Sequence, residues 1–205
     1  DMTFEAVAPA TEGWHYAMAN IQAASIGSND DVLVYGATGA IGSAAVQVLA
    51  SLGARVTAVC DGETLDLVEG LGADRVIDRT SEDFTDDGGT YDVVFDAVGK
   101  TTFGRCRRLL RPGGIFLTTD LGPWWQNPSL GVFTRLFGRK RVILAVPGDT
   151  RDVADQVKAM MEAGQFRPLI DRTYPLDRIV EAYRYVETGQ KIGNVVITVT
   201  HAERG

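Results

Sequence analysis

The sequence is poor in the residues that build disulfide frameworks and metal centres. Among its 205 residues there are two cysteines, Cys60 and Cys106, and two histidines, His15 and His201. Two cysteines so far apart give neither a disulfide framework nor the spacing of zinc ligands. The two histidines are also far apart in the sequence, so we expect no resident metal.

Long apolar runs and an excess of positive charge are missing as well. No run approaches the roughly 18 apolar residues that a spanning helix needs, and no signal peptide is recognisable at the start. The net charge is −7, and an acidic surface disfavours nucleic acid and anionic membranes as partners. We therefore expect a cytoplasmic protein with no nucleic-acid and no membrane partner.

What the sequence does contain is a strand, a glycine turn and a helix in immediate succession. Val32–Tyr35 is a short apolar run of strand character, and Ser43–Leu52 carries apolar residues at helical spacing. Between them stand Gly36, Gly39 and Gly42. A helix N-terminus offers free N–H groups and a positive dipole end, and glycine lets the backbone approach a pyrophosphate. The stretch therefore predicts a dinucleotide-binding βα unit.

The glycine pattern alone is weak support, and its surroundings strengthen it. Compared with GxGxxG the motif is imperfect, because Ala37 stands where the first glycine would be. However, a second strand is predicted at Arg55–Val59, and Asp61 follows it. Asp61 lies near the offset of about 20 residues at which an acid binds the ribose.

Strands and helices continue to alternate along the chain. Further strands are predicted at Arg75–Asp78, Tyr91–Asp96, Ile115–Thr119 and Arg141–Val146, with helices at Glu63–Leu71 and Phe103–Leu110, a sharp break at Arg111–Gly114, and an irregular stretch at Leu121–Gly138. Crossovers of this length require a parallel sheet with helices on both faces. The predicted fold class is α/β, a Rossmann-type doubly wound sheet with a C-terminal helix–strand extension.

The chain divides into three predicted parts. Residues 1–27 form a joining region of one or two helices, residues 28–147 the Rossmann domain, and residues 148–205 the helices and strand that complete it. The last part is expected to contain helices at Asp152–Ala163 and Leu176–Glu187, an extended segment at Phe166–Arg172, and a final strand at Asn194–Val199.

An ordered set of segments resembles the medium-chain dehydrogenase/reductases, in their zinc-independent, quinone-oxidoreductase-like branch. The segments are Glu12–Met18, Val32–Gln47, Val56–Cys60, Leu71–Asp78, Tyr91–Lys100, Leu109–Gly114, Ile170–Gly189 and Lys191–Val199. Taken singly, LLRPGG is common to many Rossmann-like proteins, but the whole ordered set is specific. The resemblance implies an NAD(P)(H)-binding oxidoreductase that transfers hydride between the cofactor and a small-molecule quinone, enone, aldehyde or alcohol.

The resemblance also implies which residues meet the cofactor. They are Thr38, Gly39, Ala40 and Ile41 at the glycine turn, Cys60 and Asp61 after the second strand, Asp96, Ala97, Val98 and Gly99 beside the nicotinamide ribose, Thr118 and Thr119 beside the nicotinamide, Tyr16 at the nicotinamide end of the cleft, and Lys191 and Asn194 where the chain returns. No catalytic residue is assigned, because hydride transfer needs no covalent chemistry from the protein.

The chain departs from the family at its start. Members carry an N-terminal catalytic domain of the GroES-like type, and the segments matched here begin only at the joining helix. Residue 1 is Asp rather than Met, so we expect the chain to begin inside something longer. Cofactor binding carries over from the resemblance, whereas catalysis by this chain alone does not.

The choice between NAD(H) and NADP(H) depends on the end of the second strand. A carboxylate there binds the ribose diol and repels a 2′-phosphate, and Asp61 and Glu63 are both acidic, which favours NAD(H). Relatives in this branch often place Ser or Thr and then a basic residue at this point, which favours NADP(H) slightly more. Both cofactors remain open from the sequence.

Several reactive side chains have a structural interpretation that we prefer. Cys60 is typical of a small buried apolar residue at a strand end. Cys106 stands beside arginines that could lower its pKa, but packing is favoured. Asp96 is expected to orient the turn that follows it. Trp124 and Trp125 could line a substrate pocket or cover an interface, and the sequence does not decide.

Two other classes of function compete with the oxidoreductase. One is a non-catalytic dinucleotide-binding or dimerisation module, in which Arg141–Val146, as an edge strand, pairs with a second copy to form a homodimer. The other is a methyltransferase, which YDVVFDAVG followed by LLRPGG partly resembles. The methyltransferase is disfavoured, because its glycine loop is denser in glycine than GATGAIG and normally follows a strand with an acidic residue.

Overall fold

The computed structural model describes residues 3–148 and 152–199, and His201 lies outside them. The helices are α1 (Phe4–Ala24), α2 (Ala40–Ser51), α3 (Leu65–Gly70), α4 (Phe103–Cys106), α5 (Gln126–Phe137), α6 (Val153–Glu162) and α7 (Ile179–Glu187). The strands are β1 (Asp31–Tyr35), β2 (Arg55–Cys60), β3 (Arg75–Asp78), β4 (Tyr91–Asp96), β5 (Leu110–Thr118), β6 (Arg141–Leu144), β7 (Ile170–Pro175) and β8 (Asn194–Thr198). Within these ranges no helix combines the length and apolar character needed to cross a membrane.

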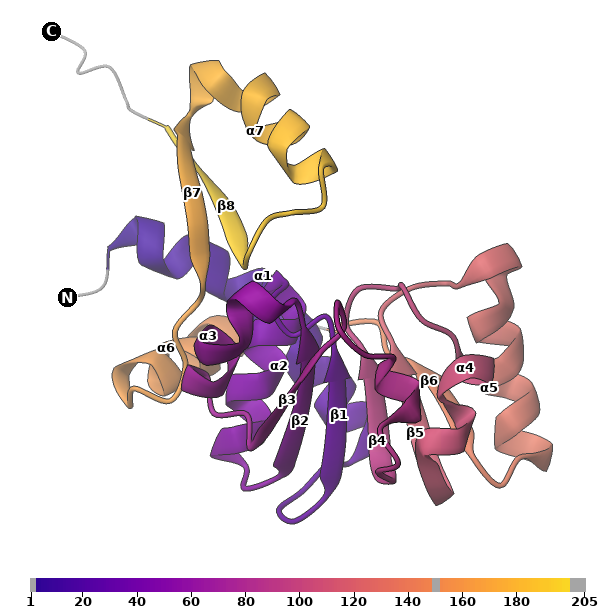
Figure 1. The fold of residues 1–205 in the computed structure, drawn as a ribbon. Helices are drawn as coiled ribbons and strands as arrows, with labels where there is room; N and C mark the ends of the chain where they lie inside the picture. The colour runs from indigo at the N-terminus through magenta and orange to yellow at the C-terminus, as the bar shows by residue number, and fades with distance from the viewer. Residues whose placement is uncertain (1–2, 149–151, 200–205) are drawn as a thin grey trace, which may run out of the picture.

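Six strands form one parallel sheet in the order β3-β2-β1-β4-β5-β6, which confirms the predicted doubly wound fold (Figure 1). The strand order reverses between β1 and β4. Neighbouring carboxyl ends are in register there, with Val59, Asp96 and Thr118 in the same row as Tyr35. Ligands of open α/β sheets bind in the crevice at such a reversal, so this edge is where a site is expected.

Successive side chains of each strand enter two different cores. In β1, Val32 and Val34 pack into the core on one face, together with α1 and α2, whereas Leu33 packs into the core on the other face. All three side chains are completely buried. Burial on both faces explains why the central strands are continuous apolar runs rather than alternating ones.

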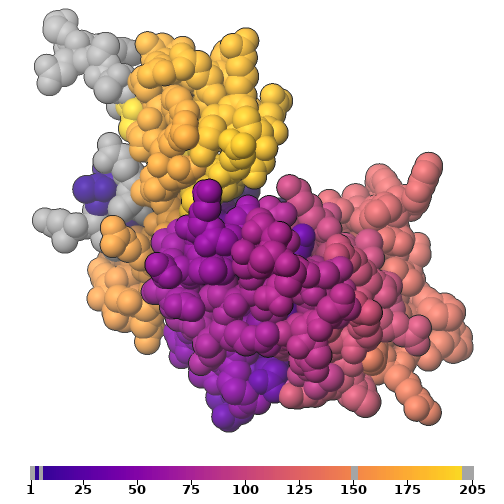
Figure 2. Space-filling view, in the orientation of Figure 1, coloured from indigo at the N-terminus to yellow at the C-terminus, as the bar shows by residue number. Residues whose placement is uncertain are grey.

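Residues 170–198 form a small C-terminal unit with a two-stranded sheet separate from the large one. Strands β7 and β8 pair in parallel with α7 connecting them, and this unit stands against the carboxyl edge of the large sheet (Figures 1 and 2). The residue before β8 is hydrogen-bonded to the glycine turn: the N–H of Gly193 donates to the carbonyl of Thr38 at 2.6 Å. The division at residues 27 and 147 stays a prediction.

One segment predicted to be irregular is helical. Leu121–Gly138 contains α5, which begins immediately after Trp125. Both Trp124 and Trp125 adopt left-handed backbone conformations, with φ of 55° and 57°. Because two left-handed residues precede the helix and a proline lies in its first turn, the sequence pattern does not indicate a helix here. The prediction for this segment was therefore wrong.

Four predicted boundaries also change. The helix predicted over Phe103–Leu110 ends early, as α4 followed by a 3-10 turn, and β5 already begins at Leu110. Leu110 pairs with Tyr91, and the register then shifts, so Arg111–Gly114 forms an irregularity inside the strand rather than a break before it. Helix α2 begins at Ala40 instead of Ser43, and β7 replaces the extended segment predicted at Phe166–Arg172.

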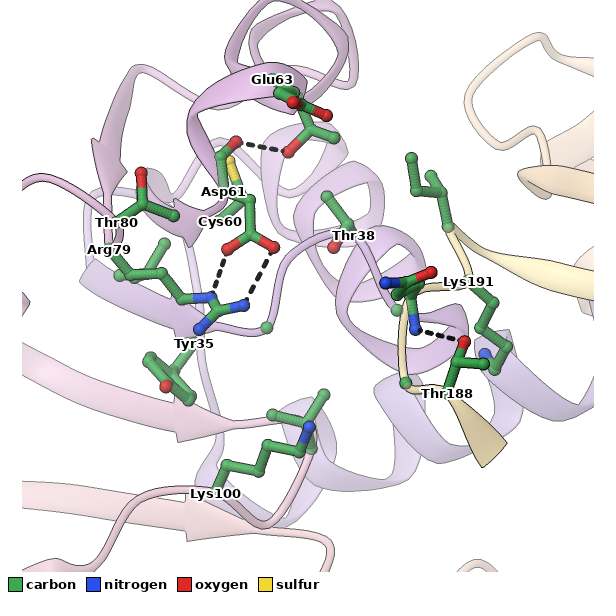
Figure 3. Close-up of a pocket in the computed structure, with 18 of the residues that line it drawn as sticks. Tyr35, Thr38, Cys60, Asp61, Glu63, Arg79, Thr80, Lys100, Thr188 and Lys191 are labelled. Atoms are coloured by element: carbon green, nitrogen blue, oxygen red, sulfur yellow. Dashed lines mark hydrogen bonds and ion pairs between the residues drawn. The ribbon is translucent and has the colours of Figure 1, made fainter. Parts of the chain in front are cut away.

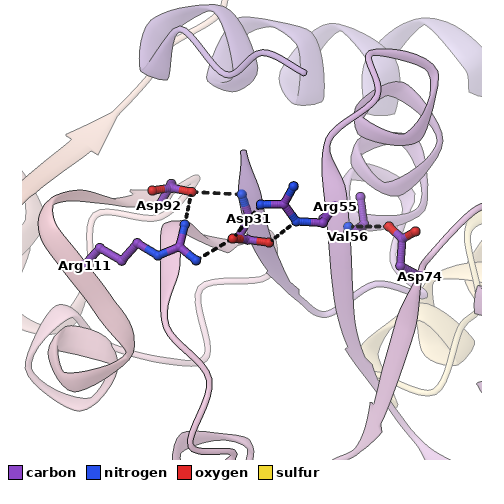
Figure 4. Close-up of polar contacts among 6 residues, drawn as sticks. All are labelled: Asp31, Arg55, Val56, Asp74, Asp92 and Arg111. Atoms are coloured by element: carbon purple, nitrogen blue, oxygen red, sulfur yellow. Dashed lines mark hydrogen bonds and ion pairs between the residues drawn. The ribbon is translucent and has the colours of Figure 1, made fainter. Parts of the chain in front are cut away.

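The amino-terminal edge of the sheet is held by a cluster of charged residues (Figure 4). Arg55 donates from Nε and Nη2 to the two carboxylate oxygens of Asp31, at 2.6 and 2.8 Å. Arg111 donates to Asp31 at 2.5 Å and to Asp92 at 2.6 Å. The hydrogen bond from Arg55 and the adjacent Arg111 hold the pKa of Asp31 at about 2. The cluster links β1, β2, β4 and β5 at the edge opposite the crevice.

Candidate dinucleotide-binding site

A cavity of about 1000 Å³ opens at the carboxyl edge of the sheet, between the strand ends and the C-terminal unit (Figure 3). Its walls come from five places that are distant in the sequence. They are Tyr35, Gly36, Thr38 and Gly39 from the glycine turn, Val59 to Thr64 after β2, Arg79 and Thr80 after β3, Val98 and Lys100 after β4, and Tyr185, Val186 and Thr188 to Ile192 from the C-terminal unit.

The three glycines of the turn serve different purposes. A Cβ on Gly36, whose φ is 83°, would lie 2.5 Å from the Val98 side chain, and one on Gly42 would lie 2.1 Å from the carbonyl of Gly36. The protein itself therefore requires these two glycines. A Cβ on Gly39 would approach no other residue closer than 3.5 Å, an ordinary contact. Packing within the protein therefore does not require a glycine at position 39, and Gly39 lines the cavity.

The helix that begins at the turn faces the cavity with its amino end. Gly39 is the N-cap residue of α2, no side chain caps the helix, and its first turn contains no acidic residue. The first N–H groups of a helix have no acceptor inside it and carry the positive end of the dipole. This end of α2 therefore suits a diphosphate group.

A buried carboxylate shapes the wall after β4. Asp96 is fully buried and accepts the backbone N–H groups of Val98 and Lys100 at 3.3 Å and of Thr101 at 3.1 Å. Burial raises the pKa of Asp96, and these hydrogen bonds oppose the rise. The carboxylate holds the turn, as predicted, and so presents Val98 and Lys100 to the cavity.

The wall after β2 contains an ion pair that the sequence analysis missed. Arg79 contacts Asp61 twice, from Nε to Oδ1 at 2.5 Å and from Nη2 to Oδ2 at 2.9 Å (Figure 3). Strand register could have revealed it, because Cys60 pairs with Asp78 and the next residue of each strand emerges beside the other. Asp61, the predicted selector of the 2′ position, is therefore not an isolated negative charge.

The C-terminal wall contributes a second cationic group. Lys191 donates from Nζ to the carbonyl of Gly193 at 2.7 Å, and burial lowers its pKa. Together with Arg79 and Lys100, it places three basic side chains around the cavity. Basic side chains and an open helix amino end provide the donors that an anionic ligand needs. The described residues therefore fit a dinucleotide.

The structure brings together part of the predicted cofactor set. The cavity is lined by Thr38, Gly39, Cys60, Asp61, Val98 and Lys191. The other predicted residues are not among its lining: Tyr16, Ala40, Ile41, Asp96, Ala97, Gly99, Thr118, Thr119 and Asn194. Of these, Ala40 and Ile41 form the first turn of α2, and the Asn194 amide donates to the carbonyl of Leu169 at 2.9 Å. A cofactor role for each residue stays a prediction.

Both cysteines are free thiols and buried, as expected for packing residues. Cys60 is 2% exposed, and burial raises the pKa of its thiol. Cys106 is completely buried, and burial raises its pKa to about 11 in spite of the neighbouring Arg105. Its sulfur lies 3.3 Å from the hydroxyl of Thr101. Neither thiol has the lowered pKa of a nucleophile.

Fold and cavity together define a nucleotide-binding domain of the Rossmann type, and comparisons with known proteins identify its family. A family model described as zinc-binding dehydrogenase matches residues 71–197. The chain belongs to this family, within the medium-chain dehydrogenase/reductase superfamily, as the nicotinamide-cofactor-binding portion of its quinone-oxidoreductase-like members.

Relatives share the same portion of sequence. The chain is 32% identical to the mitochondrial NAD(P)H oxidoreductase RTN4IP1 of Mus musculus, over 82% of this chain and 47% of that protein. It is 30% identical to the chloroplastic NADPH-dependent alkenal/one oxidoreductase of Arabidopsis thaliana, over 81% and 40%. The quinone oxidoreductase of Coxiella burnetii has the same fold, with a TM-score of 0.83, 20% identity, and coverage of 92% and 59%. The chain spans about half the length of the curated relatives it matches.

The family's description implies zinc, and the described residues do not fit that ion. Among them, no three His, Cys, Asp or Glu side chains gather into a group that could hold a metal. Cys60 and Cys106 belong to the cores on opposite faces of the sheet. Protein zinc sites need three or four such ligands around one point.

Proposed function

We propose that this chain is the cofactor-binding portion of an NAD(P)H-dependent oxidoreductase that acts on a quinone, enone, aldehyde or alcohol. The observation that carries the proposal is the amino end of α2 at Gly39, which no side chain caps, on the wall of a cavity that Arg79, Lys100 and Lys191 also line. The names of the two relatives, an NAD(P)H oxidoreductase and an NADPH-dependent alkenal/one oxidoreductase, support the cofactor, and the second name supports an enone or unsaturated aldehyde as substrate.

Each wall of the cavity has a part in the proposed binding. When bound, the nicotinamide cofactor supplies the hydride chemistry. The amino end of α2 at Gly39 binds the diphosphate, and the pair of Asp61 and Arg79 meets the adenosine ribose. Asp96 keeps the turn after β4 in place. The segment around Lys191, which belongs to the C-terminal unit, closes one side of the cavity and excludes water there.

The decisive experiment is a calorimetric titration of the 205-residue chain with NADPH, NADH and ADP-ribose. We expect binding of at least one of the two cofactors and of ADP-ribose, because the donors at α2 face a group that all three contain. A thermal unfolding scan shows that the same sample is folded. A folded chain that binds none of the three would overturn the proposal.

We also propose that the protein forms a homodimer along β6. In the part of the chain that the structure describes, β6 is the last strand of the sheet and pairs only with β5. Beside it, α5 exposes Val132, Phe133, Leu136 and Phe137, each at least 60% exposed. A free strand edge next to an apolar helix suits a second copy of the same surface.

Sedimentation velocity tests the dimer. We expect the wild-type chain to sediment as a dimer, and the double substitution Phe133→Lys and Phe137→Lys to give a monomer with unchanged dinucleotide binding. A wild-type chain that is monomeric at all concentrations would contradict it, and would leave binding by the cavity unaffected. A cytoplasmic location stays a prediction; the two relatives are named as mitochondrial and chloroplastic.

A further inference from the structure

Helix α5 directs its polar side to the protein and its apolar side to solvent. Its two buried residues, Asn127 and Thr134, are both polar. The Thr134 hydroxyl donates to the carbonyl of Leu130 at 2.6 Å and accepts the N–H of Val142 at 3.0 Å, which fastens the helix to β6. A surface helix normally directs its apolar stripe to the core. In α5 most of the large apolar side chains are instead left outside the core.

The apolar side of α5 forms one exposed stripe. Its members are each at least 60% exposed: Val132, Phe133, Leu136 and Phe137. Residues four apart are neighbours on a helix surface, and the ring centroids of Phe133 and Phe137 lie 5.5 Å apart. Trp124 and Trp125, directly before the helix, are 96% and 71% exposed. An exposed apolar patch of this kind marks an interaction surface.

The segment that contains this stripe is basic, although the chain as a whole is acidic. From Leu121 to Gly148 the sequence has no Asp or Glu and four basic residues, Arg135, Arg139, Lys140 and Arg141, whereas the net charge of the chain is −7. The three arginines are exposed, and within the part of the chain that the structure describes they form no ion pair. Their charge is therefore free to attract an anionic partner.

Helix α7 is a useful contrast, because it also exposes apolar side chains. Val180 and Tyr183 are 57% and 66% exposed. However, α7 contains Glu181 and Glu187, and Glu181 forms an ion pair with Arg178 at 2.5 Å. An anionic surface would repel these carboxylates. The combination of an exposed apolar stripe with unpaired positive charge therefore distinguishes α5 from α7.

We infer that α5 and the basic residues after it form a docking surface for an anionic lipid bilayer. The helix has 12 residues and is too short to span a bilayer, so it lies along the interface. Phe133 and Phe137 enter the region of the acyl chains, and Arg135 and Arg139 meet the lipid phosphates. The prediction of no membrane partner used the net charge of the chain, which conceals the opposite charge of this segment.

The surface lies at the β6 margin of the molecule, away from the C-terminal unit (Figures 1 and 2). Residues of α5 line neither of the two cavities, so this inference does not depend on the proposed cofactor binding. The proposed dimer would cover the same helix, so vesicles bind the monomer. Salt separates the two occupants, because it weakens attraction to lipid but reduces the repulsion between the basic residues of two copies.

The experiment is co-sedimentation of the 205-residue chain with vesicles, at a protein concentration where sedimentation velocity shows a monomer. One set of vesicles contains phosphatidylcholine alone, and the other contains phosphatidylcholine and phosphatidylserine in equal amounts. We expect binding to the mixed vesicles, lost at high salt, and affinity for the neutral vesicles weaker by roughly tenfold or more. Trp14 is buried, so a blue shift of the emission on binding reports Trp124 and Trp125.

Two double variants test the apolar part of the surface. Phe133→Ser with Phe137→Ser removes both rings, so we expect affinity for the mixed vesicles to fall by about tenfold or more, while calorimetry gives unchanged NADPH affinity. Val180→Ser with Tyr183→Ser is the matched control, because it removes exposed apolar side chains from α7, and it should bind vesicles as the wild type does. Circular dichroism shows that each chain is folded.

Two further double variants test the charge. Arg135→Gln with Arg139→Gln should weaken binding by roughly 10- to 30-fold, because each basic residue near an anionic surface contributes about fivefold. Lys158→Gln with Arg184→Gln removes the same amount of charge from α6 and α7 and should retain binding.

Each other result overturns the inference. A monomeric wild type that ignores the mixed vesicles, or that binds both kinds equally, contradicts a bilayer site that depends on charge. Binding without a blue shift, or a control that loses as much affinity as its test variant, places another surface against the lipid. A chain that is dimeric at every concentration and binds no vesicles assigns α5 to a second copy. All of these results leave the proposed cofactor binding standing.

Discussion

The two edges of the central sheet each carry an arginine–aspartate cluster, and the two clusters differ in what surrounds them. At the amino edge, Asp31 is held by two arginines from β2 and β5, and its carboxylate is 20% exposed. At the carboxyl edge, Asp61 has one arginine partner and is 48% exposed at the wall of a cavity. The same pair of residue types therefore ties strands together at one edge and faces a ligand space at the other.

Contact distances therefore do not by themselves reveal the role of an ion pair, because these two pairs have similar distances and different surroundings. Half-exposed pairs contribute little to folding, because water competes for both charges and solvent screens them. The amino-edge cluster combines several charges across four strands and holds the pKa of Asp31 at about 2. We expect stability to depend on the amino edge and ligand choice to depend on the carboxyl edge.

The largest effect is expected from the substitution Gly39→Val, which fills the ligand space at the carboxyl edge. A Cβ at this position makes only ordinary contacts with the protein, so we expect the fold to remain while dinucleotide affinity falls by about 100-fold or more. Calorimetry and thermal unfolding measure the two effects. Gly42→Ala is the matched control, because its Cβ would lie 2.1 Å from a carbonyl oxygen and should destabilise the protein. Retained binding in Gly39→Val would disprove the diphosphate assignment.

Next in size is Asp31→Asn, which opens the amino-edge cluster. The variant loses charge-assisted hydrogen bonds from Arg55 and Arg111, so we expect the free energy of unfolding to fall by about 2–3 kcal/mol. Asp61→Asn should lower it by less than about 1 kcal/mol. Urea unfolding of both variants measures the difference. Equal losses would mean that the two edges do not differ in the way described.

Acid should weaken the amino edge through Asp31. Its pKa is lowered from 3.8 to about 2 in the folded chain, so its contribution is complete above about pH 4 and is lost as the pH falls through 2. We expect about 1–2 kcal/mol of the stability of the wild type to disappear in this window and to be missing from Asp31→Asn. The urea midpoints of the wild type and of Asp31→Asn at several pH values test this. Midpoints that fall equally with pH in both proteins would contradict it.

The smallest effect is expected from Asp61→Ser at the carboxyl edge. The substitution removes a negative charge from the predicted ribose-binding position, and it also removes the partner of Arg79. We expect a shift of the affinity ratio toward NADPH of about threefold, less than a full charge-assisted hydrogen bond. Competition titration resolves such a change. An unchanged ratio would show that Asp61 does not face the 2′ position.

The sequence predicted the sheet well, because its signals are local. Apolar runs such as Val32–Tyr35 and Tyr91–Asp96 fall on β1 and β4, and the glycine turn between strand and helix marks the binding edge. Segments whose backbone departs from common conformations were not predicted. Helix α5 follows two tryptophans with positive φ, and the start of β5 lies before an irregularity in the strand pairing.

Residue patterns alone predicted the part of the candidate site that one segment supplies, and the family resemblance added Val98 and Lys191. Gly39 and Asp61 follow from the βα unit alone, whereas Arg79 enters the site through the pairing of β2 with β3. In the wall from Tyr185 to Ile192 the family resemblance named Lys191 alone, because the rest depends on how the C-terminal unit packs against the sheet. Side chains brought together by strand register and tertiary packing are the ones that sequence patterns miss.

The hydrogen bond from Gly193 to Thr38 has a consequence for the order in which the protein becomes functional during synthesis. It joins segments roughly 150 residues apart, and contacts of such high sequence separation require a large loop to close. On the ribosome, the glycine turn emerges long before the strand that closes the cavity beside it. A nascent chain that ends before Gly193 cannot form this hydrogen bond, so we expect cofactor affinity to appear only after translation has passed this residue.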